Sequence, residues 1–184
     1  GSGSSAVLTV PNLTLNSNNI ALGTSAGQTN QGPSNIAIGN QAGYNNQGSG
    51  GYSIAVGYQA GYDGQGINSI AIGTNALYTN TGASSNIAIG YGTLFASTGQ
   101  NNVAIGDSAL NSNGSTSYNT AIGYQALYSE TAGSANTAVG WSAMSGASAG
   151  SNNTALGTSA LNGVSGSNNV AVGHSAGNSL TAGA

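Results

Sequence analysis

The sequence predicts an all-β fold, a parallel β-solenoid of about ten coils of 16–18 residues each. Three observations lead to this prediction: a motif that recurs at nearly constant spacing, a strand-like alternation within it, and a composition that disfavours helices. In a solenoid each repeat forms one coil, and the coils stack so that their strands form parallel ladders about 4.8 Å apart. The polar, low-complexity composition alone would suit a disordered chain, but the regular repeat argues against disorder.

The recurring motif is the tetrad x-Ala-x-Gly, in which x is an aliphatic residue or Thr. A repeat of 16 residues is too short to hold a strand and a full crossover helix, and abundant Gly, Asn and Ser disfavour helix. We therefore expect each coil to contain a strand, a turn, a second short strand around the Ala-Leu that follows the Gly, and a polar loop. The copies of the tetrad end at Gly23, Gly39, Gly57, Gly73, Gly90, Gly106, Gly123, Gly140, Gly157 and Gly173.

Within the tetrad an Ala stands between two larger residues, as in Ile87-Ala88-Ile89. Successive strand residues point to opposite faces, and we expect the aliphatic face to fill the interior of the coil. The invariant Ala face would then be covered by another subunit of a cyclic oligomer. The alternative is that Ala suits a tight bend within one coil. The expected interface residues are Ala21, Ala37, Ala55, Ala71, Ala88, Ala104, Ala121, Ala138, Ala155 and Ala171.

The segments before the tandem differ from it. Residues 1–5 are Gly and Ser and are expected to be a linker. Residues 6–18 alternate in hydrophobicity around Pro11, and we expect a capping strand that covers the edge of the first coil. Residues 19–184 then form the repeat domain.

The chain has no Lys, Arg or Cys, three acidic residues and one His, for a net charge of −3. Without cations it cannot neutralise phosphates, so no nucleic-acid partner is expected. No apolar run approaches the roughly 20 residues that span a bilayer, so this segment is not expected to insert into a membrane. The acids and His174 are dispersed among the coils. We therefore expect no enzymatic activity, no metal site and no cofactor.

The aromatic residues are the candidate ligand-binding residues. They recur directly after the tetrad Gly and again five residues after it. Exposed rings beside amides and hydroxyls are typical of sites for neutral sugars. The alternative is a structural ladder of rings stacked from coil to coil. The candidates are Tyr58, Tyr91, Tyr124, Trp141, Tyr62 and Tyr128.

Units such as Asn35-Ile36-Ala37-Ile38-Gly39 and Asn169-Val170-Ala171-Val172-Gly173 resemble the head repeats of trimeric autotransporter adhesins, whose motif is approximately Asn-Ser-Val-Ala-Ile-Gly. Residues 119–127 are also similar to repeats of trimeric bacteriophage tail fibres. The resemblance implies a left-handed β-roll, a homotrimer and an extracellular location, on a bacterial surface or a virion tail fibre. The adhesin repeats are shorter than those of this chain, which implies larger loops here.

The repeat and the resemblance together suggest a surface-exposed adhesin or tail-fibre segment that attaches to cells, host surface proteins or glycans. A structural spacer or self-assembling filament without a ligand is the alternative. Ice binding is disfavoured, because the short Thr ladder of Thr120, Thr137 and Thr154 falls in a column expected to lie in the core.

Overall fold

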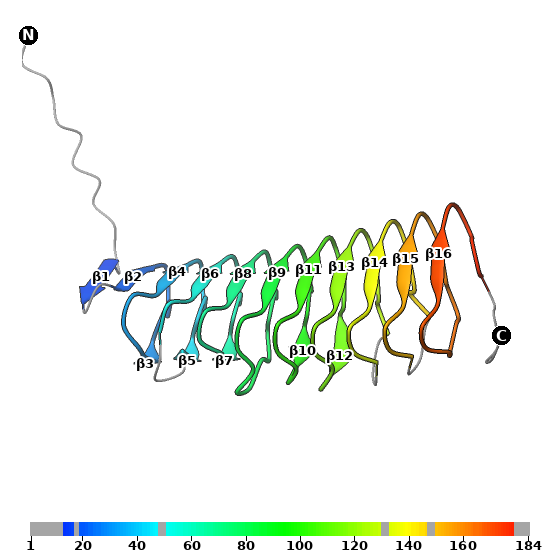
Figure 1. Ribbon diagram of the computed structural model, residues 1–184. Coiled ribbons are helices and arrows are strands. Elements are labelled where there is room, and N and C mark those ends of the chain that lie inside the picture. Colours follow the sequence, from blue (N-terminus) through cyan, green and yellow to red (C-terminus); the bar gives the residue numbers. More distant parts are fainter. Residues whose placement is uncertain (1–12, 17–18, 48–50, 130–132, 147–149, 179–184) are drawn as a thin grey trace, which may run out of the picture.

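The computed structural model describes residues 13–16, 19–47, 51–129, 133–146 and 150–178. In these residues the chain is all-β and contains no helix. It winds as a parallel β-solenoid whose strands stack side by side along a rod (Figure 1). The fold class predicted from the sequence, a helix-free parallel solenoid, is thereby confirmed.

One long sheet, called the main sheet below, follows the whole rod in the strand order β1-β2-β4-β6-β8-β9-β11-β13-β14-β15-β16. From β2 to β16 its strands are the x-Ala-x segments, and they pair parallel and in register, so that each Ala lies beside the Ala of the next coil. These strands are β2 (Asn19–Leu22), β4 (Ile36–Ile38), β6 (Ile54–Val56), β8 (Ile70–Ile72), β9 (Ile87–Ile89), β11 (Val103–Ile105), β13 (Thr120–Ile122), β14 (Thr137–Val139), β15 (Thr154–Leu156) and β16 (Val170–Val172).

The first strand, β1 (Leu13–Asn16), pairs antiparallel with β2 at the N-terminal end of the main sheet. It lies within the segment 6–18 for which a capping strand is expected. The remainder of that segment, and the expected linker 1–5, lie outside the described residues.

Shorter strands run along the other side of the coil, below the main sheet in Figure 1. They are β3 (Thr29–Gln31), β5 (Asn45–Gln47) and β7 (Asp63–Gln65), which form one sheet, and β10 (Ala96–Ser97) and β12 (Ser112–Gly114), which form another. The expected second strand around Ala-Leu is wrong, because Ala109 and Leu110 lie in a turn. Leu110 has a φ of 51°, a left-handed conformation that does not occur in a strand.

The core of each coil is thin. It holds the central Ala of the tetrad, the Ala three residues after the Gly, and in most coils a Leu or Met one residue later. In the coil of β11 these residues are Ala104, Ala109 and Leu110, all completely buried. The interior of a coil therefore accommodates two methyl groups and one larger side chain.

The expected assignment of the two strand faces is wrong. The central Ala residues point into the coil, where none is more than 7% exposed, and the aliphatic residues point outwards. The strand contributes only a methyl group to the interior, because the same core also holds the completely buried side chains of the turn, such as Ala109 and Leu110. The ten residues expected at a subunit interface, Ala21, Ala37, Ala55, Ala71, Ala88, Ala104, Ala121, Ala138, Ala155 and Ala171, are thus core residues of the single chain.

Each main-sheet strand from β2 to β16 ends directly before the tetrad Gly. Gly106 has a φ of 128°, and a Cβ added there would lie 2.5 Å from the carbonyl oxygen of Gly123 in the next coil. Both the backbone conformation and the spacing of the coils therefore require Gly at this position.

A ladder of buried amides stands at the start of the strands. The Oδ1 atom of Asn119 accepts a hydrogen bond of 2.9 Å from the backbone N–H of Asn136, and its Nδ2 donates to the carbonyl oxygen of Gly133 at 3.2 Å. The same pattern recurs along the rod, with Ser53 and Ser69 in place of Asn in two coils. The ladder satisfies backbone groups where each loop enters the next strand.

Candidate functional site: the outer face and its flanks

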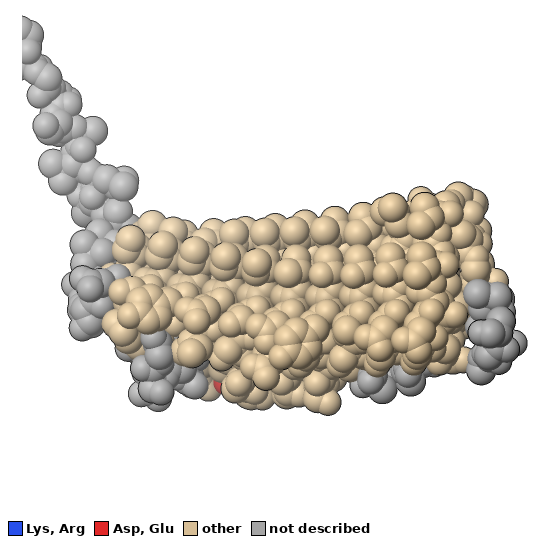
Figure 2. Space-filling model, in the orientation of Figure 1, with Lys and Arg blue, Asp and Glu red and all other residues tan. Residues whose placement is uncertain are grey.

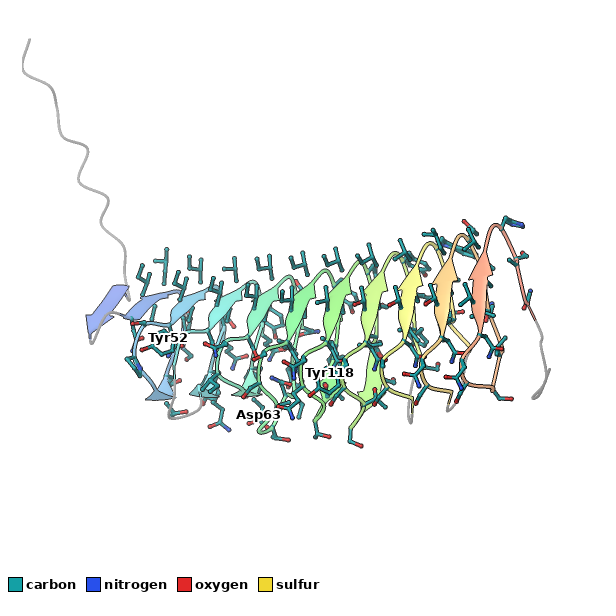
Figure 3. The ribbon with its side chains drawn as sticks, in the orientation of Figure 1. Tyr52, Asp63 and Tyr118 are labelled. Atoms are coloured by element: carbon teal, nitrogen blue, oxygen red, sulfur yellow. The ribbon has the colours of Figure 1, made fainter. Side chains whose placement is uncertain are left out.

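The outer face of the main sheet carries two columns of aliphatic and Thr side chains. Residue-for-residue pairing of the strands aligns each column into a ridge that follows the rod, and Figure 3 shows these side chains standing along the upper side of the sheet. Ile38, Ile72 and Ile122 are each 37–38% exposed. We define the outer face by Ile20, Ile36, Ile54, Ile70, Ile87, Val103, Thr120, Thr137, Thr154 and Val170, with Leu22, Ile38, Val56, Ile72, Ile89, Ile105, Ile122, Val139, Leu156 and Val172.

Two further columns border the outer face, one at each end of the strands. The start flank lies two residues before the first outward residue of a coil, and its members have φ values between 57° and 62°. The end flank directly follows the tetrad Gly. The start flank comprises Ser34, Tyr52, Asn68, Ser85, Asn101, Tyr118, Ala135, Asn152 and Asn168, and the end flank Thr24, Asn40, Tyr58, Thr74, Tyr91, Asp107, Tyr124, Trp141, Thr158 and His174.

The start flank contains two large side chains, Tyr52 and Tyr118, which are not among the ligand-binding residues predicted from the sequence. Each is 63% exposed, and Figure 3 shows both below the main sheet, well separated along the rod. A left-handed conformation costs a residue other than Gly about 1 kcal/mol, and no burial within the chain offsets that cost. A signal was present in the sequence, because Tyr-x-x-Ala-x-Gly-Tyr occurs at residues 52–58 and again at 118–124.

Four of the predicted ligand-binding residues lie on the end flank and are well exposed. Tyr58, Tyr91, Tyr124 and Trp141 are 44–58% exposed. The rings of Tyr124 and Trp141 stack with their centroids 6.2 Å apart, whereas Tyr58 and Tyr91 are separated by the coil of Thr74. The end flank therefore offers aromatic surface to a ligand or to another protein.

The other two predicted residues belong to the column five residues after the Gly. Here Tyr44, Tyr62, Tyr78 and Phe95 form a stack with centroids 4.9–5.1 Å apart and ring planes within 5° of parallel. Both faces of the Tyr62 ring are covered, so it cannot offer a face to a sugar. The structural-ladder alternative holds for this stack. Tyr128 occupies the same column further along, half-buried and beyond Asn111.

The environment of the stack affects the ionisation of Tyr62. Partial removal from water raises the pKa of Tyr62 above its ordinary value of 10.0, and the neighbouring Tyr78, Tyr44 and Asp63 raise it further. Asp63 itself accepts a hydrogen bond of 3.0 Å from the Nδ2 of Asn45.

Charge is sparse over the molecule. Figure 2 shows a surface without Lys or Arg and with one small acidic spot near its lower edge. In the described segments, no three His, Cys, Asp or Glu side chains are grouped so that they could hold a metal ion. A search of the same segments for a helix long and apolar enough to cross a membrane finds none. The outer face and its flanks offer surface for apolar contact.

Comparison with known proteins adds no family: no protein-family model, no curated protein and no solved structure matches this chain significantly. The resemblance to adhesin and tail-fibre repeats rests on the motif alone.

Proposed function

We propose that this chain is a segment of an extracellular fibre, on a bacterial surface or a virion tail, in which copies of the chain pack side by side through the outer face. The observation that supports this proposal most is the pair of mostly aliphatic columns that line the outward side of the whole main sheet and are at least partly exposed in every coil. An apolar patch of this size matches the largest patch on a typical monomer, and such patches often mark functional contact sites.

The occupant that fits the outer face best is a second copy of the chain. Ridges that repeat about every 4.8 Å mesh best with ridges of the same repeat. The chain has no Lys or Arg, and none of its acidic residues lies in the two outer columns, so identical faces do not repel one another. Copies related by a rotation axis parallel to the rod would form a closed assembly with a shared aliphatic core. The resemblance implies three copies.

The dimensions of the face indicate how much of it must take part. The main sheet from β2 to β16 is about 43 Å long, and three strand residues are about 10 Å wide, which gives about 430 Å² per copy. A stable interface between two partners buries about 800 Å² on each of them, and in a trimer each copy divides its buried area between two neighbours. Including the two flanks roughly doubles the width and brings the area to about 860 Å². A stable assembly through this surface would therefore involve the flanks.

Attachment to neutral glycans is a second proposed function and an alternative to side-by-side packing, because the exposed rings of the end flank can contact a sugar only where no neighbouring copy covers them. Tyr58, Tyr91, Tyr124 and Trp141 offer apolar surface among Asn, Gln and Ser side chains, the combination that holds a sugar ring and its hydroxyls. If no ligand binds, the chain would act as a structural spacer within the fibre.

Light scattering on the purified chain tests the assembly. We expect the mass of three chains at micromolar concentration. Replacing Ile72→Ser together with Ile122→Ser should weaken association at least tenfold, since two apolar contacts per copy are lost. The matched control is Ile67→Ser, because Ile67 is equally exposed but lies outside the outer face. A folded wild-type monomer at micromolar concentration would contradict the proposal.

A glycan array tests attachment. We expect a neutral glycan to bind the wild type, and Tyr91→Ala with Trp141→Ala to abolish that binding. The control is Tyr62→Phe, which keeps the covered ring of the stack and should bind normally. Binding that survives the first change would show that the end flank is not the site, and a wild type that binds no glycan would favour the spacer.

A further inference from the structure

We infer that two inter-subunit tyrosine pairs fix the axial alignment of the assembly: Tyr52 with Tyr58 of the partner subunit, and Tyr118 with Tyr124 of the partner subunit. This inference rests on the proposed side-by-side assembly. It goes beyond that proposal by assigning a role in register selection to individual residues.

The aliphatic columns cannot set the register by themselves. They repeat in every coil, so a copy displaced along the rod by one coil, about 4.8 Å, would meet almost the same neighbours. It would lose the contacts of one coil at the end and keep the rest. A feature that does not repeat in every coil is needed to select one alignment.

The two flanks meet in the proposed assembly. When outer faces turn towards a common axis parallel to the rod, the start flank of one copy lies against the end flank of its neighbour, and residues at equal height face one another. Tyr52 and Tyr58 border β6 at its two ends, and Tyr118 and Tyr124 border β13 in the same way. Aligned copies therefore bring tyrosine against tyrosine at two heights.

A displaced copy breaks both tyrosine–tyrosine pairs and regains an aromatic contact at no more than one of the two heights. Tyr occurs in the start flank in two coils, and in both the end flank also carries Tyr. A shift of one coil in either direction would place Tyr52 against Asn40 or Thr74, and Tyr118 against Asp107 or Trp141. In three of these four contacts a small or charged side chain takes the place of the second aromatic ring. An aromatic pair contributes more binding free energy than its buried area alone would give, so these contacts are weaker.

The conformation of the start-flank tyrosines supports a role outside the single chain. Tyr52 and Tyr118 adopt φ values of 62° and 61° and remain 63% exposed. Asn, which tolerates the left-handed conformation better, occupies this flank in four other coils. A strained, exposed tyrosine gains a compensating contact only when a neighbouring copy covers it.

Cysteine pairs placed away from the tyrosines can report the register, because the chain has no native Cys. Asn101→Cys with Asp107→Cys, one at each end of β11, reports aligned copies. Ser85→Cys with Asp107→Cys reports copies displaced by one coil. A short bis-maleimide bridges the thiols, and a link within one chain leaves the mass of that chain unchanged, so only links between chains are counted. Linked chains are counted on a denaturing gel.

In the wild-type background we expect the aligned pair to link at least tenfold more than the displaced pair. With Tyr52→Asn and Tyr118→Asn, the ratio of chains linked through the aligned pair to chains linked through the displaced pair should fall towards one. The matched control is Tyr91→Thr with Trp141→Thr, because these end-flank rings face Ser85 and Ala135 rather than tyrosine. That control should leave the ratio unchanged.

The other outcomes separate this inference from the proposed function. If the aligned pair links and the ratio survives Tyr52→Asn with Tyr118→Asn, the register inference is overturned and the assembly stands. If nothing links although the mass is that of several chains, the flanks do not meet, which also overturns the inference. If nothing links and the mass is that of one chain, the proposed assembly fails and the inference fails with it.

Discussion

The inner and outer faces of each main-sheet strand are both apolar, yet they hold side chains of different size. The inner position is Ala in every coil, and Ala88, Ala104 and Ala121 are completely buried. The outer positions are mostly Ile, Val or Leu, and several are more than a third exposed. In a coil this narrow, the smallest side chain marks the interior, and larger apolar side chains mark a surface that is available for association.

The largest expected effect comes from enlarging an inner residue. Ala121→Leu forces three extra carbon atoms between Ala104 and Ala138 of the adjacent coils and should lower the free energy of unfolding by about 3 kcal/mol. The adjacent outer residue supplies the control: Thr120→Leu should change it by less than about 0.5 kcal/mol. Urea denaturation measures the change in the free energy of unfolding for both variants, at a protein concentration low enough that the chains are dissociated. Equal effects of the two changes would show that the faces are wrongly assigned.

A smaller effect is expected in the polar part of the interior. Asn119→Ala leaves the Asn136 N–H and the Gly133 carbonyl without the side chain that binds them, which should cost about 2 kcal/mol. Asn119→Ser should cost less, since Ser69 holds the equivalent position and accepts a bond of 3.2 Å from the Asn86 N–H. Thermal unfolding compares both with Asn40→Ala on the exposed end flank. A cost for Asn40→Ala as large as that for Asn119→Ala would refute the role of the ladder.

The main-sheet strands could be predicted from the sequence because the tetrad recurs in every coil. Aligning its copies also gives the register in which neighbouring strands pair. Which face points into the coil could not be predicted. The alternation shows that the two faces carry different side chains, but either face could be the inner one. Ten invariant Ala residues and two aliphatic columns satisfy either assignment until the width of the coil is known. The turn at Ala109-Leu110 could not be foreseen either, since Leu seldom adopts the left-handed conformation that it has here. The prediction that the rings of the end flank are exposed is confirmed. The prediction for Tyr62 fails because the rings of Tyr44 and Tyr78 stack on its two faces, and the spacing of the residues in the sequence does not show how their rings are oriented.

The smallest expected effect is on stability at high pH and comes from the stack of Tyr44, Tyr62, Tyr78 and Phe95. Because the pKa of Tyr62 is raised above 10.0 in the folded state, its contribution to stability is fully present below pH 10 and is lost as the pH rises through the folded-state pKa. We expect Tyr62→Phe to reduce the steepness of that loss. Subtracting the tyrosinate absorbance of the variant from that of the wild type isolates the titration of Tyr62. A midpoint at or below pH 10 would contradict the proposed desolvation of this ring.

The most direct test of the central claim, that the outer face is an association surface, is small-angle X-ray scattering on the full chain. It gives the mass and the length of the particle in one measurement. Side-by-side packing predicts the mass of three chains in a rod no longer than one solenoid, whose main sheet from β2 to β16 is about 43 Å long. A single-chain mass, or a multiple mass in a rod lengthened in proportion, would contradict the account.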